Sequence, residues 1–155
     1  MVSRAASQVH EPDARYLQSP AVAGTLVDSC ILIDVLADDL RWADWSLDQL
    51  DQLGQRAPLV INPIILAEIS PRFERASDLE AALAALPLVR EALPWDAAFL
   101  AGQAFKVYRL SKGAKTSPMP DFYIGAHAIV RNLQVLTRDA GRYRNYFPKL
   151  PIVAP

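Results

Sequence analysis

The chain of 155 residues lacks the features that mark disulfide-stabilised, zinc-thiolate and membrane proteins. Cys30 is its only cysteine, which excludes an internal disulfide and a cysteine-based zinc site within one chain. No apolar run approaches the roughly 20 residues that a membrane span needs, and no apolar segment like that of a secretory signal begins the chain. We therefore expect a cytoplasmic protein with no membrane contact. The 52% hydrophobic and 21% charged residues are typical of a globular domain.

Acidic side chains are scarce in the last third of the chain. Residues 1–102 hold 15 acids and 7 bases, a net charge of −8, whereas residues 103–155 hold 9 bases and 2 acids, a net charge of +7. This segregation indicates a face that binds a polyanion. A solvated surface or a contact with an acidic partner chain would give the same pattern.

Short apolar runs alternate with helical periods from residue 24 onward. Strands are predicted at 24–28, 58–62, 89–93, 134–137 and 150–154. The segments between them predict helices, one of which begins with Asn62 as cap and Pro63 in its first turn. This alternation predicts an α/β fold with a central, mostly parallel sheet of about five strands and helices on both faces. Residues 1–23 show no period, so we interpret them as an N-terminal extension to one domain at residues 24–155.

Four carboxylates fall where the carboxyl ends of parallel strands should meet. Asp28 ends the first predicted strand, with Ser29 placed to cap the next helix, and Asp139 lies two residues beyond the strand at 134–137. Asp121 begins a helix that is apolar nearly all round, and Glu68 lies in the second turn of the helix after the second strand. Ligands sit at this edge of an open parallel sheet. Taken singly, each acid could instead cap a helix or join an ion pair.

Taken together, four ionised carboxylates at one place raise each other's pKa values unless a cation is present. Oxygen ligands select hard cations, so the sequence predicts Mg²⁺, with Mn²⁺ as the alternative. A metal held in this way suits the hydrolysis of phosphodiester bonds by an activated water.

Four segments resemble a known family. VDSCILID (27–34), INPIILAEI (61–69), MPDFYIGAHA (119–128) and VLTRDAGRYRNYFP (135–148) resemble, in this order, the motif regions of PIN-domain proteins. They are most similar to those of VapC-type ribonuclease toxins of prokaryotic toxin–antitoxin pairs. The resemblance implies a three-layer α/β/α fold and a Mg²⁺-dependent endoribonuclease.

The resemblance also assigns residues to roles. The acidic quartet of the family falls on Asp28, Glu68, Asp121 and Asp139. Hydroxyl groups that orient ligands or water fall on Ser29 and Thr137. Cys30 stands where such proteins often carry Asn or Ser, a difference that bears on hydrogen bonding around the acids rather than on the metal site itself.

The resemblance further implies a homodimer that is neutralised by a small VapB-like antitoxin. Basic side chains are expected to contact either RNA or this antitoxin: Lys112, Lys115, Arg138, Arg142 and Arg144. Trp42 and Trp45 lie near the early helices, where this family often makes dimer contacts, although core packing fits them equally well. Aromatic residues at 143, 146 and 147 could stack on unpaired bases, but such residues near the end of a small domain more often join the core.

Two other functions compete with the endoribonuclease. A catalytically silent PIN-like module would use its basic face to bind RNA or protein, but it has no use for four repelling acids. A Mg²⁺-dependent phosphatase would need a nucleophilic aspartate in a fixed motif after the first strand, which DSCILID does not match well.

Overall fold

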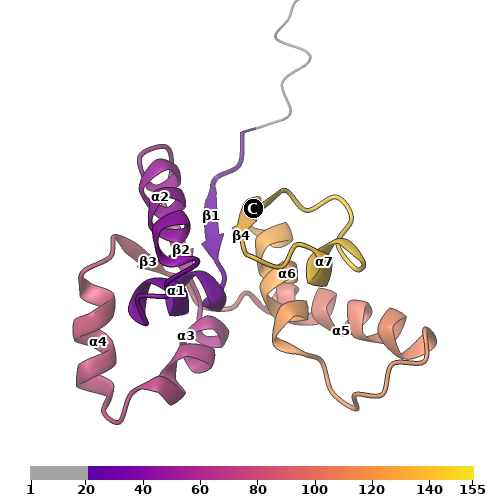
Figure 1. Cartoon of the computed structure of the whole chain (residues 1–155). Helices are drawn as coiled ribbons and strands as arrows, with labels where there is room; N and C mark the ends of the chain where they lie inside the picture. The colour runs from indigo at the N-terminus through magenta and orange to yellow at the C-terminus, as the bar shows by residue number, and fades with distance from the viewer. Residues whose placement is uncertain (1–20) are drawn as a thin grey trace, which may run out of the picture.

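The computed structural model describes residues 21–155, and the predicted extension at residues 1–23 lies almost wholly outside them. Five parallel strands form one sheet in the order β3-β2-β1-β4-β5 (Figure 1). The strands are β1 (Gly24–Val27), β2 (Leu59–Ile61), β3 (Leu88–Arg90), β4 (Leu133–Leu136) and β5 (Ile152–Val153). The prediction of a three-layer α/β/α fold around about five mostly parallel strands is confirmed.

The described residues contain seven α-helices and one 3₁₀ turn at Ser70–Arg72. The helices are α1 (Ser29–Leu36), α2 (Ala43–Gly54), α3 (Pro63–Ile69), α4 (Ala76–Ala84), α5 (Trp95–Leu110), α6 (Pro120–Val130) and α7 (Gly141–Arg144). In Figure 1, α1 to α4 lie on one side of β1 and α5 to α7 on the other. Within residues 21–155, every helix is too short or too polar to span a bilayer.

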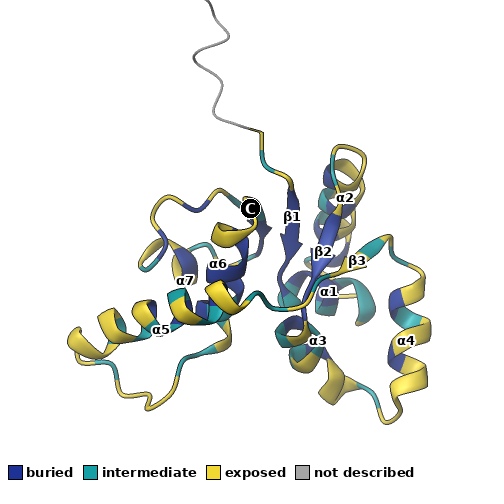
Figure 2. Ribbon diagram, turned by 180° about the vertical axis from the view of Figure 1, so that it is seen from behind, coloured by how far each residue is buried: buried dark blue, intermediate teal, exposed yellow. Residues whose placement is uncertain are grey.

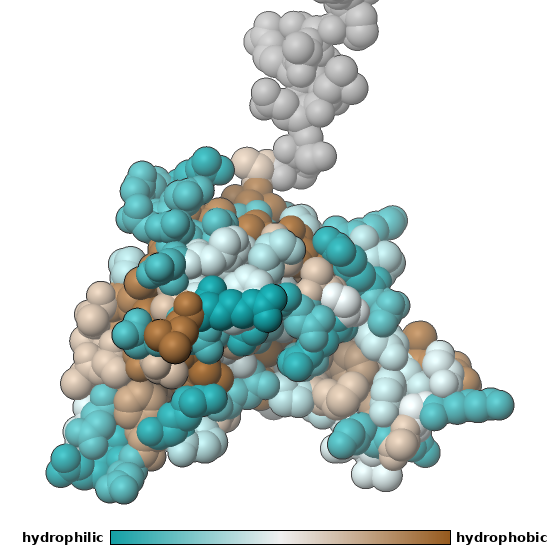
Figure 3. All heavy atoms as spheres, viewed as in Figure 1, coloured by the Kyte–Doolittle hydropathy of each residue, from teal (hydrophilic) through white to brown (hydrophobic). Residues whose placement is uncertain are grey.

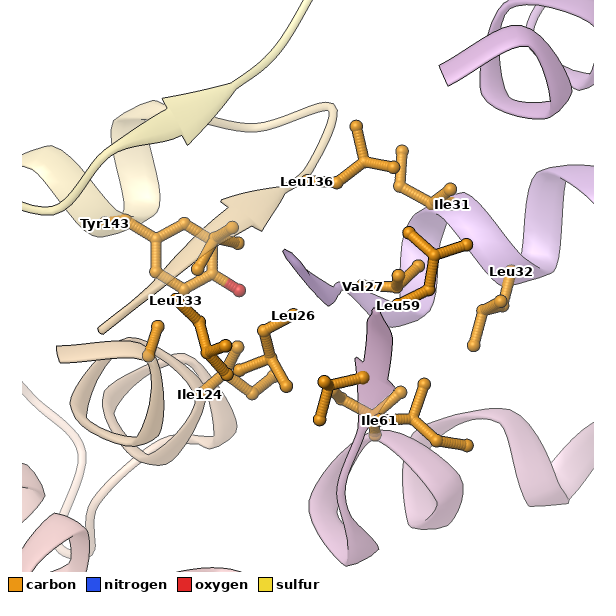
Figure 4. Packing of buried hydrophobic residues seen from close by; sticks show 14 of the residues in the cluster. Leu26, Val27, Ile31, Leu32, Leu59, Ile61, Ile124, Leu133, Leu136 and Tyr143 are labelled. Carbon is orange, nitrogen blue, oxygen red and sulfur yellow. The ribbon is translucent and has the colours of Figure 1, made fainter. Parts of the chain in front are cut away.

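The middle of the sheet is the centre of the core. Every residue of β1 and β2 is buried, as is typical of strands that helices cover on both faces (Figure 2). Leu26 and Ile124 are fully buried, and Figure 4 shows side chains from strands and helices meeting around them. Burial of one such side chain contributes about 1.5–3 kcal/mol to the stability of the fold. The packed strands therefore form a rigid support for the sheet edge that carries the acids.

Side chains at the first residues of α1 and α3 cap these helices, and one of the two predicted caps is wrong. The Asn62 side chain accepts a hydrogen bond from the Ile65 amide at 2.9 Å, and Pro63 occupies the first turn of α3, as predicted. The expectation that Ser29 caps α1 is wrong, because Asp28 is the cap and its carboxylate accepts from the Ser29 amide at 2.7 Å.

The second helix starts later than its apolar period predicts. The helical spacing of Leu40, Ala43 and Leu47 in the sequence predicts a helix from about residue 39 with Leu40 on its inner face, but α2 begins at Ala43 and Leu40 is fully exposed. The Asp39 carboxylate accepts from the amides of Arg41 and Trp42, both at 2.9 Å, and this local turn replaces the first helical turn.

Strand order places a binding edge between β1 and β4. The chain first runs from β1 toward β2 and β3, then returns to build β4 and β5 on the other side of β1. The direction of strand addition therefore reverses at the β1–β4 pair. Open α/β sheets bind ligands at such a reversal, outside the carboxyl ends of the strands.

Candidate active site

Asp28 lies at the strand reversal and is held by hydrogen bonds from three residues. It follows β1 directly and is only 3% exposed. Its Oδ1 accepts from the Ser29 amide at 2.7 Å, and its Oδ2 accepts from the Thr137 hydroxyl at 2.8 Å. These bonds fix the plane of the carboxylate and compensate for the water that burial removes.

Thr137 links Asp28 to the loop that carries Asp139. Its hydroxyl donates to Asp28 and accepts from the Asp139 amide at 3.1 Å. The Arg138 amide points to the Cys30 sulfur at 3.5 Å, and this sulfur lies 3.7 Å from the Thr137 hydroxyl. Cys30 therefore joins the loop after β4 to the first turn of α1, while burial raises the pKa of its thiol.

Tyr143 is the third donor to Asp28 and was missed by sequence reasoning. Its hydroxyl donates to Oδ2 at 2.9 Å, and its ring is fully buried. The side chain reaches inward from α7 toward the end of β1 (Figure 4). Burial and the charge of Asp28 raise the tyrosine pKa well above 10, so this group remains a donor throughout the neutral range. Asp139 lies outside α7, so no helical spacing in the sequence pointed to this contact.

Glu68 projects from α3 with one carboxylate oxygen buried and without a hydrogen-bond partner. Burial raises its pKa, the nearby Ser29 hydroxyl lowers it, and the charge of Asp28 raises it again. Such an orphaned oxygen is costly unless a cation or water meets it. The charge of Asp28 therefore affects the Glu68 pKa, and one oxygen of Glu68 remains free to accept a hydrogen bond or bind a cation.

Asp121 and Asp139 complete the acidic group, and both lie near the guanidinium of Arg142. The Arg142 guanidinium lies 2.8 Å from the Asp139 carboxylate and 3.9 Å from that of Asp121. Burial raises the pKa of Asp121 to about 6 against the lowering effect of Arg142, and the charges of the other three acids add to the rise. The four acids therefore act on one another electrostatically at this edge, as their positions in the sequence led us to expect.

The four acids offer the oxygen ligands that a hard cation prefers, but their side chains do not converge on one point. Among residues 21–155, no three His, Cys, Asp or Glu side chains converge as they stand on a point that could hold a metal ion. Two features account for this arrangement: three residues donate to Asp28, and Arg142 holds Asp121 and Asp139. The orphaned oxygen of Glu68 and the all-oxygen donor set fit Mg²⁺ or Mn²⁺. Metal binding by the four acids stays a prediction.

The structure divides the predicted basic residues into two groups. Arg138 extends to Asp34, whose carboxylate is 2.8 Å away and almost fully buried. Ser46 donates to the same carboxylate at 2.8 Å, and the guanidinium of Arg138 lies over the Trp42 ring at 5.4 Å. Arg138 and Arg142 thus pair with acids of this chain, although Arg142 is more than half exposed, whereas three exposed basic side chains have no acidic partner within residues 21–155: Lys112, Lys115 and Arg144. Their binding roles stay predictions.

His127 and the late aromatic residues belong to the interior. Asn62 donates to Nδ1 of His127, which leaves Nε2 to donate to the Glu91 carboxylate at 3.0 Å. Tyr143 and Phe147 are buried, and Tyr146 packs edge-on against Phe122. The core interpretation of these aromatic residues is confirmed, and base stacking by Tyr143 or Phe147 is excluded by their burial.

Solved structures of similar fold come from several bacteria. VapBC2 from Rickettsia felis bound to a DNA fragment from their promoter matches with a TM-score of 0.68 and 16% identity over 84% of this chain and 98% of that one. DNA-bound VapBC from Salmonella typhimurium matches with a TM-score of 0.63 and 21% identity, over 84% and 97%. A toxin–antitoxin complex from Klebsiella pneumoniae matches with a TM-score of 0.56 and 23% identity, over 85% and 98%. At these identities the likeness concerns the fold.

No curated relative matches the chain. The family model of the PIN domain matches residues 25–148, which include all four acids, the two hydroxyl groups predicted to assist them and the strand reversal. This chain therefore belongs to the PIN domain family.

Proposed function

We propose that this chain is a metal-dependent endoribonuclease that acts in the cytoplasm as the toxin of a toxin–antitoxin pair. The observation that carries the proposal is the group of four acids at the strand reversal, whose mutual repulsion helps to raise the Asp121 pKa to about 6. A domain without catalytic use for this edge would gain stability by replacing these acids. The similar fold of the bacterial toxin–antitoxin complexes supports the biological role.

Asp28, Glu68, Asp121 and Asp139 would hold Mg²⁺ or Mn²⁺, which supplies the positive charge that favours attack by water on a phosphodiester. Thr137 and Tyr143 keep the Asp28 carboxylate in one orientation, so one ligand needs little reorganisation. The buried oxygen of Glu68 is ready to accept without losing an existing hydrogen bond. Asp121 must lose its proton to take part, so metal binding competes with that proton below about pH 6.

RNA is the proposed substrate, and three exposed basic residues are its proposed contacts. Lys112 and Lys115 follow α5, and Arg144 ends α7, the helix that carries Arg142. Contacts between such side chains and phosphates weaken steeply as salt rises. A small VapB-like antitoxin and a second copy of this chain are the other proposed partners.

A silent PIN module is the second candidate, and two observations favour it. Arg142 already neutralises two of the acids, and no three ligands converge among the described residues. The two candidates differ in whether the purified protein cleaves RNA when a divalent metal is added.

The test incubates the full chain with mixed structured RNAs and Mg²⁺ or Mn²⁺. Asp121→Asn is the test variant, and Asp96→Asn, which changes an exposed acid on α5, is the matched control. We expect cleavage by the wild type and the Asp96 variant, and none in EDTA or with the Asp121 variant. Cleavage that persists in EDTA would overturn the mechanism, and no cleavage of any RNA would favour the silent module. Growth arrest on expression, relieved by the neighbouring small protein, tests the toxin role.

A further inference from the structure

A buried hydrogen bond connects the two helices that carry Glu68 and Asp121. Hydrophilic side chains cover much of the face of the molecule in Figure 3, but Asn62 is only 3% exposed and His127 is not exposed at all. The side-chain nitrogen of Asn62 lies 3.0 Å from Nδ1 of His127. A buried polar group is costly unless it is paired, so each of these two side chains depends on the other.

Each side chain of this pair belongs to an element that carries an acid. Asn62 caps α3, and Glu68 follows it by six residues on that helix. His127 lies on α6, six residues after Asp121. The two helices are in contact, and in Figure 1 they lie on either side of the carboxyl end of β1. The hydrogen bond therefore joins the helical supports of two of the four acids.

The helix cap determines which atoms donate. Oδ1 of Asn62 accepts from the Ile65 amide at 2.9 Å, so the nitrogen of the same side chain faces His127 and must donate. Nδ1 of His127 is therefore an acceptor, and its proton is on Nε2, which donates to the Glu91 carboxylate at 3.0 Å. The imidazole thus connects the residues that follow β2 and β3 to the interior of α6 in one defined orientation.

The two hydrogen bonds of His127 differ in how readily water can replace them. The Glu91 side chain is 35% exposed and lines a hollow of about 220 Å³ together with Pro63 and Leu66. Solvent can therefore reach Glu91 when its donor is lost. Asn62 is buried, and loss of the His127 acceptor would leave its side-chain nitrogen without a partner. Loss of the Asn62 bond is thus the change that disturbs the start of α3.

We propose that His127 is a positioning residue of the acidic edge, which acts through Asn62 to hold Glu68 in place relative to Asp121 for metal binding. The inference rests on the proposed function and deepens it, because it names a residue outside the acidic group on which metal binding depends. Residues six apart in a helix point in different directions, so His127 does not face the site with Asp121. Both of its ring nitrogens are engaged and the side chain is fully buried, so it has no part as a base.

Two substitutions of His127 separate its two hydrogen bonds. His127→Asn places an oxygen near the position of Nδ1 and keeps an acceptor for Asn62. His127→Gln places its amide near the position of Nε2 and keeps only the donor to Glu91. Both replace the ring by a smaller side chain at the same buried position, so they share the cost of lost packing. A role in packing alone would make the two variants equal.

The first measurement is the affinity of the full chain for Mn²⁺ by calorimetry. His127→Gln should lower it by about 5-fold, less than the roughly 10–100-fold typical when a direct partner of a metal ligand is lost. His127→Asn should restore most of this affinity. Asn62→Ser keeps a capping hydroxyl for α3 but removes the donor to His127, so it should give the same loss as His127→Gln. The double variant Asn62→Ser/His127→Gln should lose no more than either single variant, because both changes break the same bond.

The second measurement needs no metal. In the metal-free protein, the amides of α3 should exchange with solvent about 3-fold faster in His127→Gln than in His127→Asn, as followed by mass spectrometry. Thr25→Val is the control, because Thr25 is also buried and its hydroxyl accepts from Gln134 at 2.9 Å, near the start of β1 and away from the acids. Its Mn²⁺ affinity and its α3 exchange should match those of the wild type.

The proposal is overturned if the two His127 variants have equal Mn²⁺ affinities, whether both match the wild type or both are weakened by the same factor. Equal variants of a wild type that binds Mn²⁺ and cleaves RNA leave the nuclease proposal standing, so only this inference fails. A wild type that binds no Mn²⁺ contradicts the nuclease proposal and the metal role of His127 together. Exchange of α3 then shows by itself whether the bond to Asn62 positions that helix.

Discussion

The hydroxyl of Tyr143 donates a hydrogen bond to Oδ2 of Asp28 across 115 residues of sequence. Thr137 donates to the same oxygen, so two buried hydroxyl groups from the C-terminal part of the chain fix a carboxylate at the end of β1. Tyr143 is therefore a positioning residue for the acidic edge, and the short helix α7 is the element that brings its hydroxyl to Asp28.

Tyr143→Phe should weaken metal binding without creating a cavity in the core. The ring still fills its space, but the Asp28 carboxylate loses the donor from one of the three residues that hold it and turns more freely. We expect the affinity for Mn²⁺, measured by calorimetry, to fall by about 10-fold, as is typical when a group that orients a metal ligand is lost. The free energy of unfolding should fall by about 1 kcal/mol.

Tyr146→Phe is the matched control, because the Tyr146 hydroxyl has no hydrogen-bond partner within residues 21–155 and its ring packs on Phe122. Equal Mn²⁺ affinities for the two variants and the wild type would show that the Tyr143 bond serves only folding.

The raised pKa of Asp121 predicts opposite pH trends for metal-free stability and metal binding. The folded protein holds the Asp121 proton up to about pH 6, whereas the unfolded chain releases it near its ordinary value of 3.8. Stability of the metal-free protein should therefore fall as pH rises through this window. Mn²⁺ must displace that proton, so its affinity should rise by about 10-fold per unit as pH increases toward 6 and then level off.

Urea unfolding and calorimetry at several pH values, with Asp121→Asn as the reference, measure both trends. The variant has no proton to release at this position, so its urea midpoint should lack the fall that Asp121 causes. A wild-type midpoint that changes with pH just as the variant does would contradict the assignment of the raised pKa to Asp121.

The fold and the position of the acids could be predicted because both depend on local signals. Buried strands appear as apolar runs, Asn62 and Pro63 mark a helix start, and parallel strands bring their carboxyl ends to one edge. The partners of these groups depend instead on tertiary geometry. Nothing near Arg142 in the sequence distinguishes a phosphate contact from an internal cation, and the hydroxyl of Tyr143 finds Asp28 only when α7 forms. Leu40 was misplaced because the Asp39 turn outweighs helical spacing.

Arg142 is expected to compete with the metal rather than to assist it. Its guanidinium holds Asp139 and lies near Asp121, the two acids that must turn toward a bound cation. Arg142→Gln should therefore bind Mn²⁺ several-fold more tightly, and Mn²⁺ should raise its melting temperature by a larger amount than that of the wild type. Because Arg142 is more than half exposed, its loss should have little effect on the metal-free protein.

Arg144→Gln provides the comparison for Arg142, since it removes an exposed charge two residues away. Its Mn²⁺ affinity should stay within about two-fold of the wild type, given the screening of exposed charges. Weaker Mn²⁺ binding by Arg142→Gln would mean that the guanidinium supports the metal-bound arrangement.

Arg138 and Arg144 should separate folding from RNA binding. Arg138→Met leaves the Asp34 carboxylate buried with Ser46 as its hydrogen-bond donor and removes a cation from the Trp42 ring. An uncompensated buried charge is strongly destabilising, so we expect the free energy of unfolding to fall by about 2 kcal/mol or more.

Arg144→Gln should leave stability within about 0.5 kcal/mol, since its side chain lies at the surface. RNA binding in Ca²⁺, measured over a range of salt concentrations, should weaken for Arg144→Gln with a shallower salt dependence, because one phosphate contact is lost. If Arg138→Met lowers RNA affinity at unchanged stability, the guanidinium serves RNA rather than Asp34.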